Sequence, residues 1–273
     1  MGPIEEFQRR NAELIEKGAA DESLRQLTRQ WFDRANAFEY SYHYAWMSRP
    51  IIQYPQDIVA MQELIWQVKP DLIIETGIAH GGSLIMSASM LALLDYCEAV
   101  EKGEVLDPKA TRRRVIGVDI DIRSHNRQAM EAHPMIHRID MIEGSSVDPA
   151  IVQRVHEMAK GYKRVLVSLD SNHTHDHVLQ ELQAYAPLTS VDSYCVVFDT
   201  VVEDLPEEAS ANRPWGKGNN PKTAVHEYLR GLDSSGGRGV DGKPLAFEID
   251  KAMENKLLIT VAPDGFLKRV AQR

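Results

Sequence analysis

The sequence predicts an α/β fold, an open and mostly parallel sheet with helices on both faces. Short apolar runs, too brief to form helices, alternate with stretches in which apolar residues recur at helical spacing. Such alternation is typical of βαβ units, whose crossover helices cover the faces of a parallel sheet. Most of the runs end in an acidic residue, at the edge where such sheets bind ligands. The expected strands are 72–74, 115–121, 135–142, 164–170 and 193–200.

Composition and charge narrow the classes of function. Of the 273 residues, 43% are hydrophobic and 26% are charged, which is ordinary for a soluble globular protein. The formal net charge of −9 argues against nucleic acid as a partner. Cys97 and Cys195 lack metal-type spacing and are expected to be reduced thiols of a cytoplasmic protein. We find no signal-peptide pattern and no apolar run near the ~20 residues that span a bilayer, so we expect no membrane partner.

The chain is expected to have two regions. Residues 1–56 predict a helical arm and an aromatic segment, and residues 57–273 predict the α/β domain. The arm would pack on the domain or on a neighbouring subunit, and we expect a homo-oligomer. The aromatic segment at 38–46 would either fill the core or form one wall of a ligand cleft. A long irregular stretch at about 203–221 holds Trp215 between flexible residues and predicts a lid over that cleft.

The first strand leads into a glycine-rich turn. Glu75 stands at the carboxyl end of this strand, and three glycines follow before Ser83, which is expected to cap the next helix. A strand, a glycine turn and a helix N-terminus together present free amide groups to a nucleotide-like ligand. The spacing is not G-x-G-x-x-G, and an acid at the strand end favours S-adenosylmethionine over a dinucleotide. A plain connecting turn is the alternative.

The second and third strands also end in polar residues. Asp119 stands where a carboxylate accepts hydrogen bonds from ribose hydroxyls. Asp121, two positions later, is expected to point to the same side of the sheet. Ser145 and Ser146 follow the third strand, where they would bond an adenine edge or cap the next helix.

The fourth and fifth strands predict a second chemical centre. Residues 170–177 hold two acids and three histidines, a density that suggests a metal site or an acid–base site. We favour Asp170 and His173 as functional and expect His175 and His177 to be surface residues. Asp199 ends the next strand, 29 positions later, so both acids would meet at one sheet edge. Oxygen ligands of this kind suit Mg²⁺.

Two details of the local structure complete these predictions. Asp57 is expected to cap a helix over residues 58–68. Residues 257–261 and 266–270, on either side of Pro263-Asp264-Gly265, predict a terminal hairpin or a strand and turn.

Several of these motifs, in this order, resemble the cephalosporin hydroxylase / rhamnosyl O-methyltransferase family. The resemblance covers about residues 35–270 and implies a Rossmann-like class I methyltransferase fold. Such a fold has a seven-stranded sheet with one antiparallel strand and binds S-adenosylmethionine. It implies O-methyl transfer to a small molecule, most plausibly a sugar or glycosylated metabolite. The motifs that carry it are residues 51–57, 75–83, 117–121, 170–173, 214–216 and 219–222.

The resemblance also implies roles for individual residues. The catalytic residues would be His173, as the base, and Asp170, and a metal would be held by Asp170 and Asp199. Phe198 stands where this family pattern has the first of two paired acids, so Mg²⁺ dependence is an open question. A metal-dependent hydroxylase, an NAD-dependent oxidoreductase and a non-catalytic cofactor-binding protein are the alternatives. The implied cofactor-binding residues are Glu75, Gly77, Ala79, Ser83, Asp119, Ser145, Ser146 and Asp170.

Overall fold

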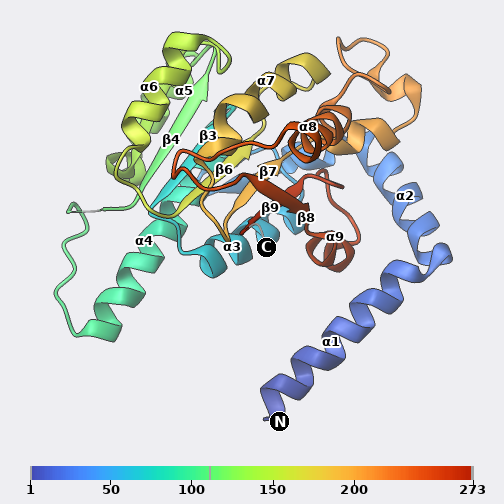
Figure 1. The fold of residues 1–273 in the computed structure, drawn as a ribbon, viewed down its shortest axis with the longest axis horizontal. Coiled ribbons are helices and arrows are strands. Elements are labelled where there is room, and N and C mark those ends of the chain that lie inside the picture. Colours follow the sequence, from blue (N-terminus) through green and yellow to red (C-terminus); the bar gives the residue numbers. More distant parts are fainter. Residues whose placement is uncertain (1, 111, 272–273) are drawn as a thin grey trace.

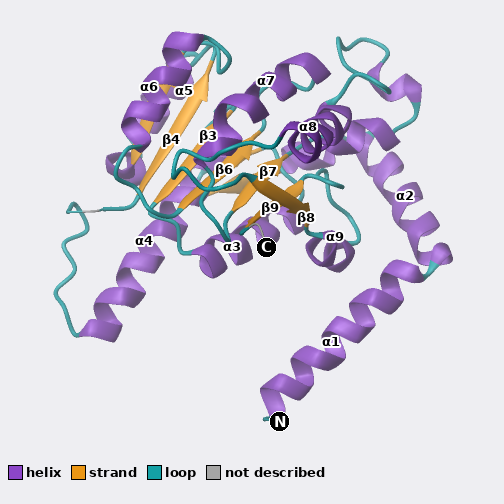
Figure 2. Ribbon diagram, viewed as in Figure 1, coloured by secondary structure: helices purple, strands orange, loops and turns teal. Residues whose placement is uncertain are grey.

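A seven-stranded sheet forms the centre of the computed structural model, which describes residues 2–110 and 112–271. The strand order is β5-β4-β3-β6-β7-β9-β8, and only β9 among these runs antiparallel to its neighbours (Figures 1 and 2). This confirms the predicted mostly parallel sheet with one antiparallel strand. The strands are β3 (Leu72–Thr76), β4 (Arg114–Asp119), β5 (Ile139–Glu143), β6 (Val165–Leu169), β7 (Tyr194–Val197), β8 (Ala246–Ile249) and β9 (Phe266–Val270).

Helices cover both faces of the sheet, and the residues of each strand alternate between the two apolar layers. Ile73 of β3 faces one layer, whereas Leu72 and Ile74 face the other, and all three are fully buried. The first layer is completed by α3 (Pro55–Val68), α4 (Gly82–Lys102) and α9 (Lys251–Leu257). The second layer is completed by α6 (Pro149–Ala159), α7 (His175–Tyr185) and α8 (Pro221–Ser235). The short helix α5 (Ser124–Glu131) follows β4.

Helix α4 is long and apolar enough to cross a membrane by length and composition alone. The expectation that no such run exists is therefore wrong for this helix. Half of its most apolar window is buried inside the protein, where Leu84, Leu91 and Leu94 pack into the first layer. Its hydropathy is accounted for by its place in the core.

The N-terminal region consists of two helices and a small hairpin. Helix α1 (Pro3–Ala20) projects away from the sheet, and α2 (Glu22–Asn36) leads back to it (Figure 1). The hairpin of β1 (Tyr44–Trp46) and β2 (Arg49–Ile51) follows. Tyr54 stacks on Phe32 of α2 with ring centroids 5.0 Å apart, and the aromatic segment packs against the first layer through Tyr40, Tyr44 and Trp46. Aromatic contacts therefore join the arm to the core.

The prediction that Asp57 caps a helix was wrong. Helix α3 begins at Pro55, and Asp57 lies inside it with its carboxylate turned inward rather than capping the helix. There it accepts hydrogen bonds from the Thr260 hydroxyl and, at 3.0 Å, from the Val261 amide. Of the two alternatives for the C-terminal residues, the hairpin does not form, because β9 pairs instead with β7 and β8. The strand and turn is confirmed, since a turn at 263–265 leads directly into β9.

The buried carboxyl of Asp57 predicts a pH-dependent stability. Burial raises its pKa to about 7, so between about pH 4 and pH 7 the folded state holds a proton that the unfolded state has lost. The contribution of Asp57 to stability is therefore present in acid and is lost as the pH rises through 7. We expect the unfolding free energy to fall from pH 5 to pH 8, by on the order of 1–3 kcal/mol from this group. Urea unfolding of Asp57→Asn should show a clearly shallower dependence, and an unchanged slope would contradict this assignment.

Candidate active site

The turn after β3 lies directly against the end of β6. Gly77 has φ +90°, and a Cβ atom there would lie 2.1 Å from the carbonyl oxygen of Asp170. The Gly77 amide donates to the Val118 carbonyl oxygen at 2.8 Å, which joins the turn to β4 as well. Only glycine fits both the backbone angle and this close approach. The ends of three neighbouring strands are thereby brought together.

Replacing Gly77 with alanine should damage both folding and cofactor binding. The added methyl group meets the Asp170 backbone, and the positive φ adds strain, so we expect a loss of roughly 3 kcal/mol or more in unfolding free energy. Gly161→Ala is the matched control, because Gly161 has φ +91° but open space around it and should lose only the strain energy. Thermal unfolding with and without S-adenosylhomocysteine measures both effects. Equal losses in the two variants would show that the close approach to Asp170 is unimportant.

Polar contacts hold the rest of this turn in place. Oδ2 of Asp119 accepts hydrogen bonds from the amides of Ile78 at 2.7 Å and Ala79 at 3.1 Å. Asn126 donates to the Ala79 carbonyl oxygen at 3.0 Å, and Ala79 has the uncommon φ of +45°. Oδ1 of Asp119 accepts the Asp121 amide at 3.1 Å, so three of about four carboxylate lone pairs are occupied. Asp119 therefore shapes the turn and retains one acceptor position for a ligand hydroxyl.

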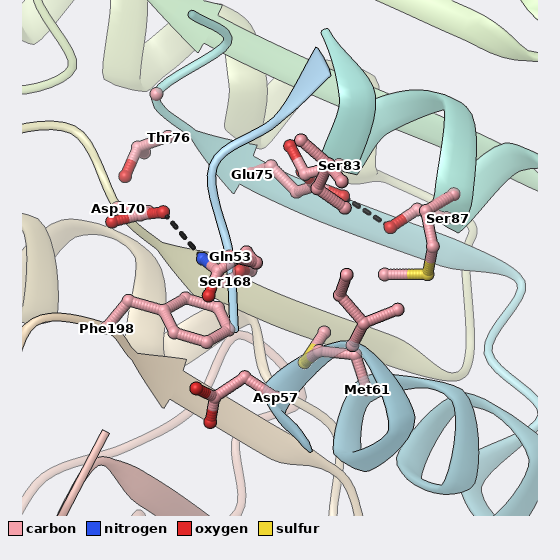
Figure 3. A pocket seen from close by; sticks show the side chains of 14 residues that line it. Gln53, Asp57, Met61, Glu75, Thr76, Ser83, Ser87, Ser168, Asp170 and Phe198 are labelled. Carbon is pink, nitrogen blue, oxygen red and sulfur yellow. Dashed lines mark hydrogen bonds between the residues drawn. The ribbon is translucent and has the colours of Figure 1, made fainter. Parts of the chain in front are cut away.

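Glu75 is buried at the end of β3 beside the first turn of α4. Burial raises its pKa, and hydrogen bonds from the hydroxyls of Ser87 and Ser83 lower it in part. Ser83 thus turns toward Glu75, and the prediction that it caps α4 was wrong. The helix begins at Gly82 after Gly81, with no side-chain cap. Figure 3 shows these groups around a small inner pocket.

The inner pocket separates Phe198 from the acids of the open cleft. It has a volume of about 20 Å³, which is room for one water molecule. Phe198 is 5% exposed and lies between Asp170 and Asp57 (Figure 3). Its ring is therefore part of the core, and it offers no oxygen where the family pattern has an acid.

Asp170, His173 and Asp199 meet above the sheet edge. One potential ligand atom from each lies within 4.8 Å of the others, which makes this trio a candidate metal centre. Burial raises the pKa of Asp170, and the nearby carboxylates of Asp199, Glu75 and Glu181 raise it further. Such crowding of negative charge favours a bound cation. Two carboxylates with an imidazole nearby fit Mg²⁺, which keeps several waters as its remaining ligands.

His173 is held by Asp199 and by the loop that was predicted to be a lid. Its Nε2 lies 3.2 Å from Oδ2 of Asp199, and its ring meets the Trp215 ring edge-on with centroids 4.8 Å apart. With the Nε2 proton directed at the carboxylate, Nδ1 is left as the basic nitrogen. Nδ1 is buried and has no hydrogen-bond partner among the described residues. Its lone pair is therefore not used by a hydrogen bond within the described part of the chain.

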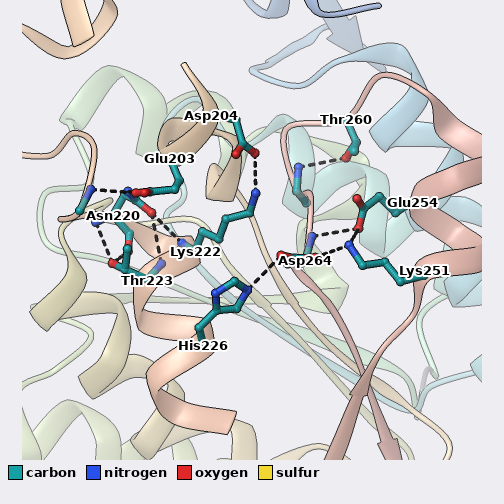
Figure 4. A network of polar contacts seen from close by, with 12 residues as sticks. Glu203, Asp204, Asn220, Lys222, Thr223, His226, Lys251, Glu254, Thr260 and Asp264 are labelled. Carbon is teal, nitrogen blue, oxygen red and sulfur yellow. Dashed lines mark hydrogen bonds and ion pairs between the residues drawn. The ribbon is translucent and has the colours of Figure 1, made fainter. Parts of the chain in front are cut away.

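The base of the Trp215 loop is fixed by a polar network (Figure 4). Glu203 accepts hydrogen bonds from the Gly218 amide, at 2.8 Å, and from the Asn220 side chain. Asn219 accepts the His175 amide at 2.9 Å, which ties the loop to the start of α7. These bonds anchor the loop, and Trp215 lies against His173. Sequence reasoning did not find these contacts, because the partners lie far apart along the chain.

The other predicted polar residues lie beside the trio rather than in it. Oγ of Ser146 lies 3.0 Å from Nε2 of His177, and the Tyr185 hydroxyl donates to the Ser146 carbonyl oxygen at 2.6 Å. Ser145 lies in the turn before α6, where its carbonyl oxygen accepts the Asp148 amide. Nε2 of His175 lies 3.2 Å from Glu227.

A cleft of about 840 Å³ opens over these groups, in the size range of small-molecule sites. Its lining runs from the glycine turn through Asp170, His173 and Asp199 to Trp215. Tyr42 and Tyr54 also line it, so the aromatic segment serves both as core and as cleft wall. Gln53, which sequence reasoning left without a role, donates to Oδ2 of Asp170 at 3.1 Å.

Comparison with known proteins identifies the family. Residues 38–270 match the family described as Rhamnosyl O-methyltransferase/CmcI. The chain belongs to this family. Rhamnosyl O-methyltransferase of Mycobacterium tuberculosis strain H37Rv is 28% identical over 218 residues, which cover 78% of this chain and 73% of that protein. The Mycobacterium leprae protein of the same name is 27% identical over 225 residues, 82% of each chain.

Solved structures agree in fold. A CmcI structure with Mg and SAM matches 84% of this chain and 78% of its own, with a TM-score of 0.53 at 17% identity. A CmcI structure with SAH gives 0.50 at 16% identity, over 84% of this chain and 83% of that one. The family assignment makes this chain an S-adenosylmethionine-dependent O-methyltransferase, and it argues against the oxidoreductase, hydroxylase and non-catalytic alternatives.

Proposed function

We propose that this enzyme methylates a hydroxyl group of a sugar or glycosylated small molecule, with His173 as the general base. The observation that carries this proposal is the Asp170–His173–Asp199 trio, at the end of the cofactor turn and inside a cleft of small-molecule size. The curated relatives named rhamnosyl O-methyltransferase support a sugar as the acceptor.

Each group of residues at this site has a proposed role in the methyl-transfer reaction. When bound, S-adenosylmethionine supplies a methyl group on a positively charged sulfur. The turn at 77–83 and Glu75 would hold its methionine end, with Asp119 at the ribose and Ser145 and Ser146 toward the adenine. Nδ1 of His173 would accept the proton of the acceptor hydroxyl while the acceptor oxygen takes the methyl group. Asp199 stabilises the imidazolium that forms, and Trp215 keeps water away.

We further propose that Asp170 and Asp199 hold Mg²⁺. The two carboxylates supply hard oxygen ligands, and such an ion lowers the pKa of a hydroxyl that it contacts. Phe198 contributes nothing to this site, so water or the acceptor would fill the remaining positions.

Transfer of a labelled methyl group from S-adenosylmethionine to a chosen acceptor tests this function. An aryl α-L-rhamnoside should be methylated, whereas catechol, a phenolic acceptor of similar size, should not. Methylation of catechol without the rhamnoside would overturn the sugar assignment while leaving the reaction type intact.

We also propose that the protein self-associates through α1. None of the α1 residues is buried, and Ile4, Phe7 and Leu14 are 73%, 64% and 52% exposed. Helix α1 packs against α9 of the same chain, but it leaves these apolar side chains uncovered, so a second copy is expected to cover them. Phe7→Glu should yield monomers in light scattering after gel filtration, whereas the exposed control Gln8→Glu should leave the assembly intact. A monomeric wild-type protein would contradict this proposal.

A further inference from the structure

The cleft extends from the glycine turn mainly toward the place where the acceptor would bind, away from the residues assigned to ribose and adenine. Its lining includes residues 77–80, Gly82 and Ser83 but neither Asp119 nor Ser146, the residues assigned to ribose and adenine. Most of the cleft is therefore left for the methionine end and for the acceptor. This inference rests on the proposed function, because it concerns what that acceptor is.

Negative charge predominates on this surface. Asp170 and Asp199 lie at its base, and three more acids line it at the exposed rim: Asp33 at the end of α2, Glu39, and Glu208 in the 3-10 turn Glu207–Ser210. No ion pair to these three rim acids is found among residues 2–110 and 112–271. Their charges are therefore uncompensated, in a chain whose formal net charge is already −9.

Positive charge is scarce on the same surface. Apart from histidines, Arg213 is the only basic side chain among the described lining residues, and no lysine is among them. The Arg213 guanidinium lies over the Trp215 ring, 5.5 Å from its centroid. Proteins that bind diphosphates use several arginine, lysine or backbone donors together. Here the amides of Gly77, Ile78 and Ala79 at the glycine turn already donate to Val118 and Asp119.

We infer that the acceptor carries no phosphate: it is an uncharged or cationic glycoside rather than a sugar nucleotide. A nucleoside diphosphate sugar would bring about two negative charges to a rim that already carries the acids Asp33, Glu39 and Glu208, whereas the proposed Mg²⁺ would offset the charges of Asp170 and Asp199 at the base. An uncharged sugar ring meets no such repulsion, and its apolar face matches the aromatic wall made by Tyr42 and Trp215. A protonated amine would be attracted by the rim acids.

Binding of dTDP to the protein saturated with S-adenosylhomocysteine tests this inference without requiring turnover. EDTA is included to prevent bridging by a metal. Glu208→Lys should bind dTDP about 5- to 10-fold more tightly than wild type, because the repulsion becomes attraction. Glu207→Lys is the matched control, since it makes the same charge change in the same 3-10 turn but does not line the cleft, and it should bind as wild type does. Salt at 0.5 M should remove most of the gain.

The methyl-transfer assay gives the second measurement. The wild-type kcat/KM for an uncharged aryl rhamnoside should exceed that for dTDP-rhamnose by at least about 10-fold. Equal gains in dTDP affinity in both lysine variants, no gain in Glu208→Lys, or a preference for dTDP-rhamnose would overturn the inference. Failure of S-adenosylhomocysteine to bind would instead overturn the proposed function, so the two failures are distinguishable.

Discussion

His173→Ala should reduce kcat about 10²- to 10⁴-fold while leaving the affinity for S-adenosylhomocysteine unchanged. Among the imidazoles of residues 2–110 and 112–271, that of His173 alone has both a carboxylate partner, at 3.2 Å, and a buried nitrogen without a hydrogen-bond partner. A sugar hydroxyl is a poor nucleophile, so loss of its proton acceptor should affect the chemical step more than binding.

His175→Ala is the control for this variant. His175 is two residues away, but its ring contacts Thr223 and Glu227 and is absent from the cleft lining. We expect it to change kcat less than a few-fold. Full activity in His173→Ala, or equal losses in both variants, would show that His173 is not the base.

Asp170→Asn should lower the activity of the enzyme and raise its unfolding temperature. We expect activity to fall by roughly 10²-fold or more, because a carboxylate ligand of the proposed Mg²⁺ is lost. The same variant should unfold at a higher temperature than wild type in EDTA. Burial and three neighbouring carboxylates raise the pKa of Asp170, so its ionised form is costly at neutral pH, and asparagine removes that charge while keeping the shape.

Divalent-cation affinity and thermal unfolding check both parts of this prediction. Titration of Mn²⁺ by electron paramagnetic resonance should show at least 10-fold weaker binding in Asp170→Asn than in wild type. Glu181→Gln is a useful comparison, because Glu181 also raises the pKa of Asp170 but lies outside the trio. Unchanged Mn²⁺ affinity in Asp170→Asn would exclude Asp170 as a ligand.

The acidic ends of strands were predictable from the sequence because parallel strands end at one edge of their sheet. Asp170 and Asp199 follow apolar runs one βα unit apart, and the structure brings them together with His173. The same rule placed Glu75 and Asp119 near the glycine turn. Local sequence patterns and the topology of a parallel sheet were therefore sufficient to predict that these acids lie at one edge of the sheet.

Contacts between distant segments were not predictable in this way. Gln53 reaches Asp170 across 117 positions, and Asp57 reaches Thr260 across 203. Asp57 has the sequence position of a helix cap, and only the neighbouring C-terminal segment shows that its side chain turns inward. Ser83 was misassigned for the same reason, since the buried Glu75 carboxyl attracts its hydroxyl. The contact of Trp215 with His173 likewise depends on tertiary packing.

The most direct test of this account is a thermal-shift titration with S-adenosylhomocysteine and with NAD, each in Mg²⁺ and in EDTA. A ligand that binds only the folded state raises the melting temperature by mass action. The account predicts a rise with S-adenosylhomocysteine, none with NAD, and an added stabilisation by Mg²⁺ that Asp170→Asn abolishes. A rise with NAD alone, or no rise with S-adenosylhomocysteine, would contradict the account at its centre.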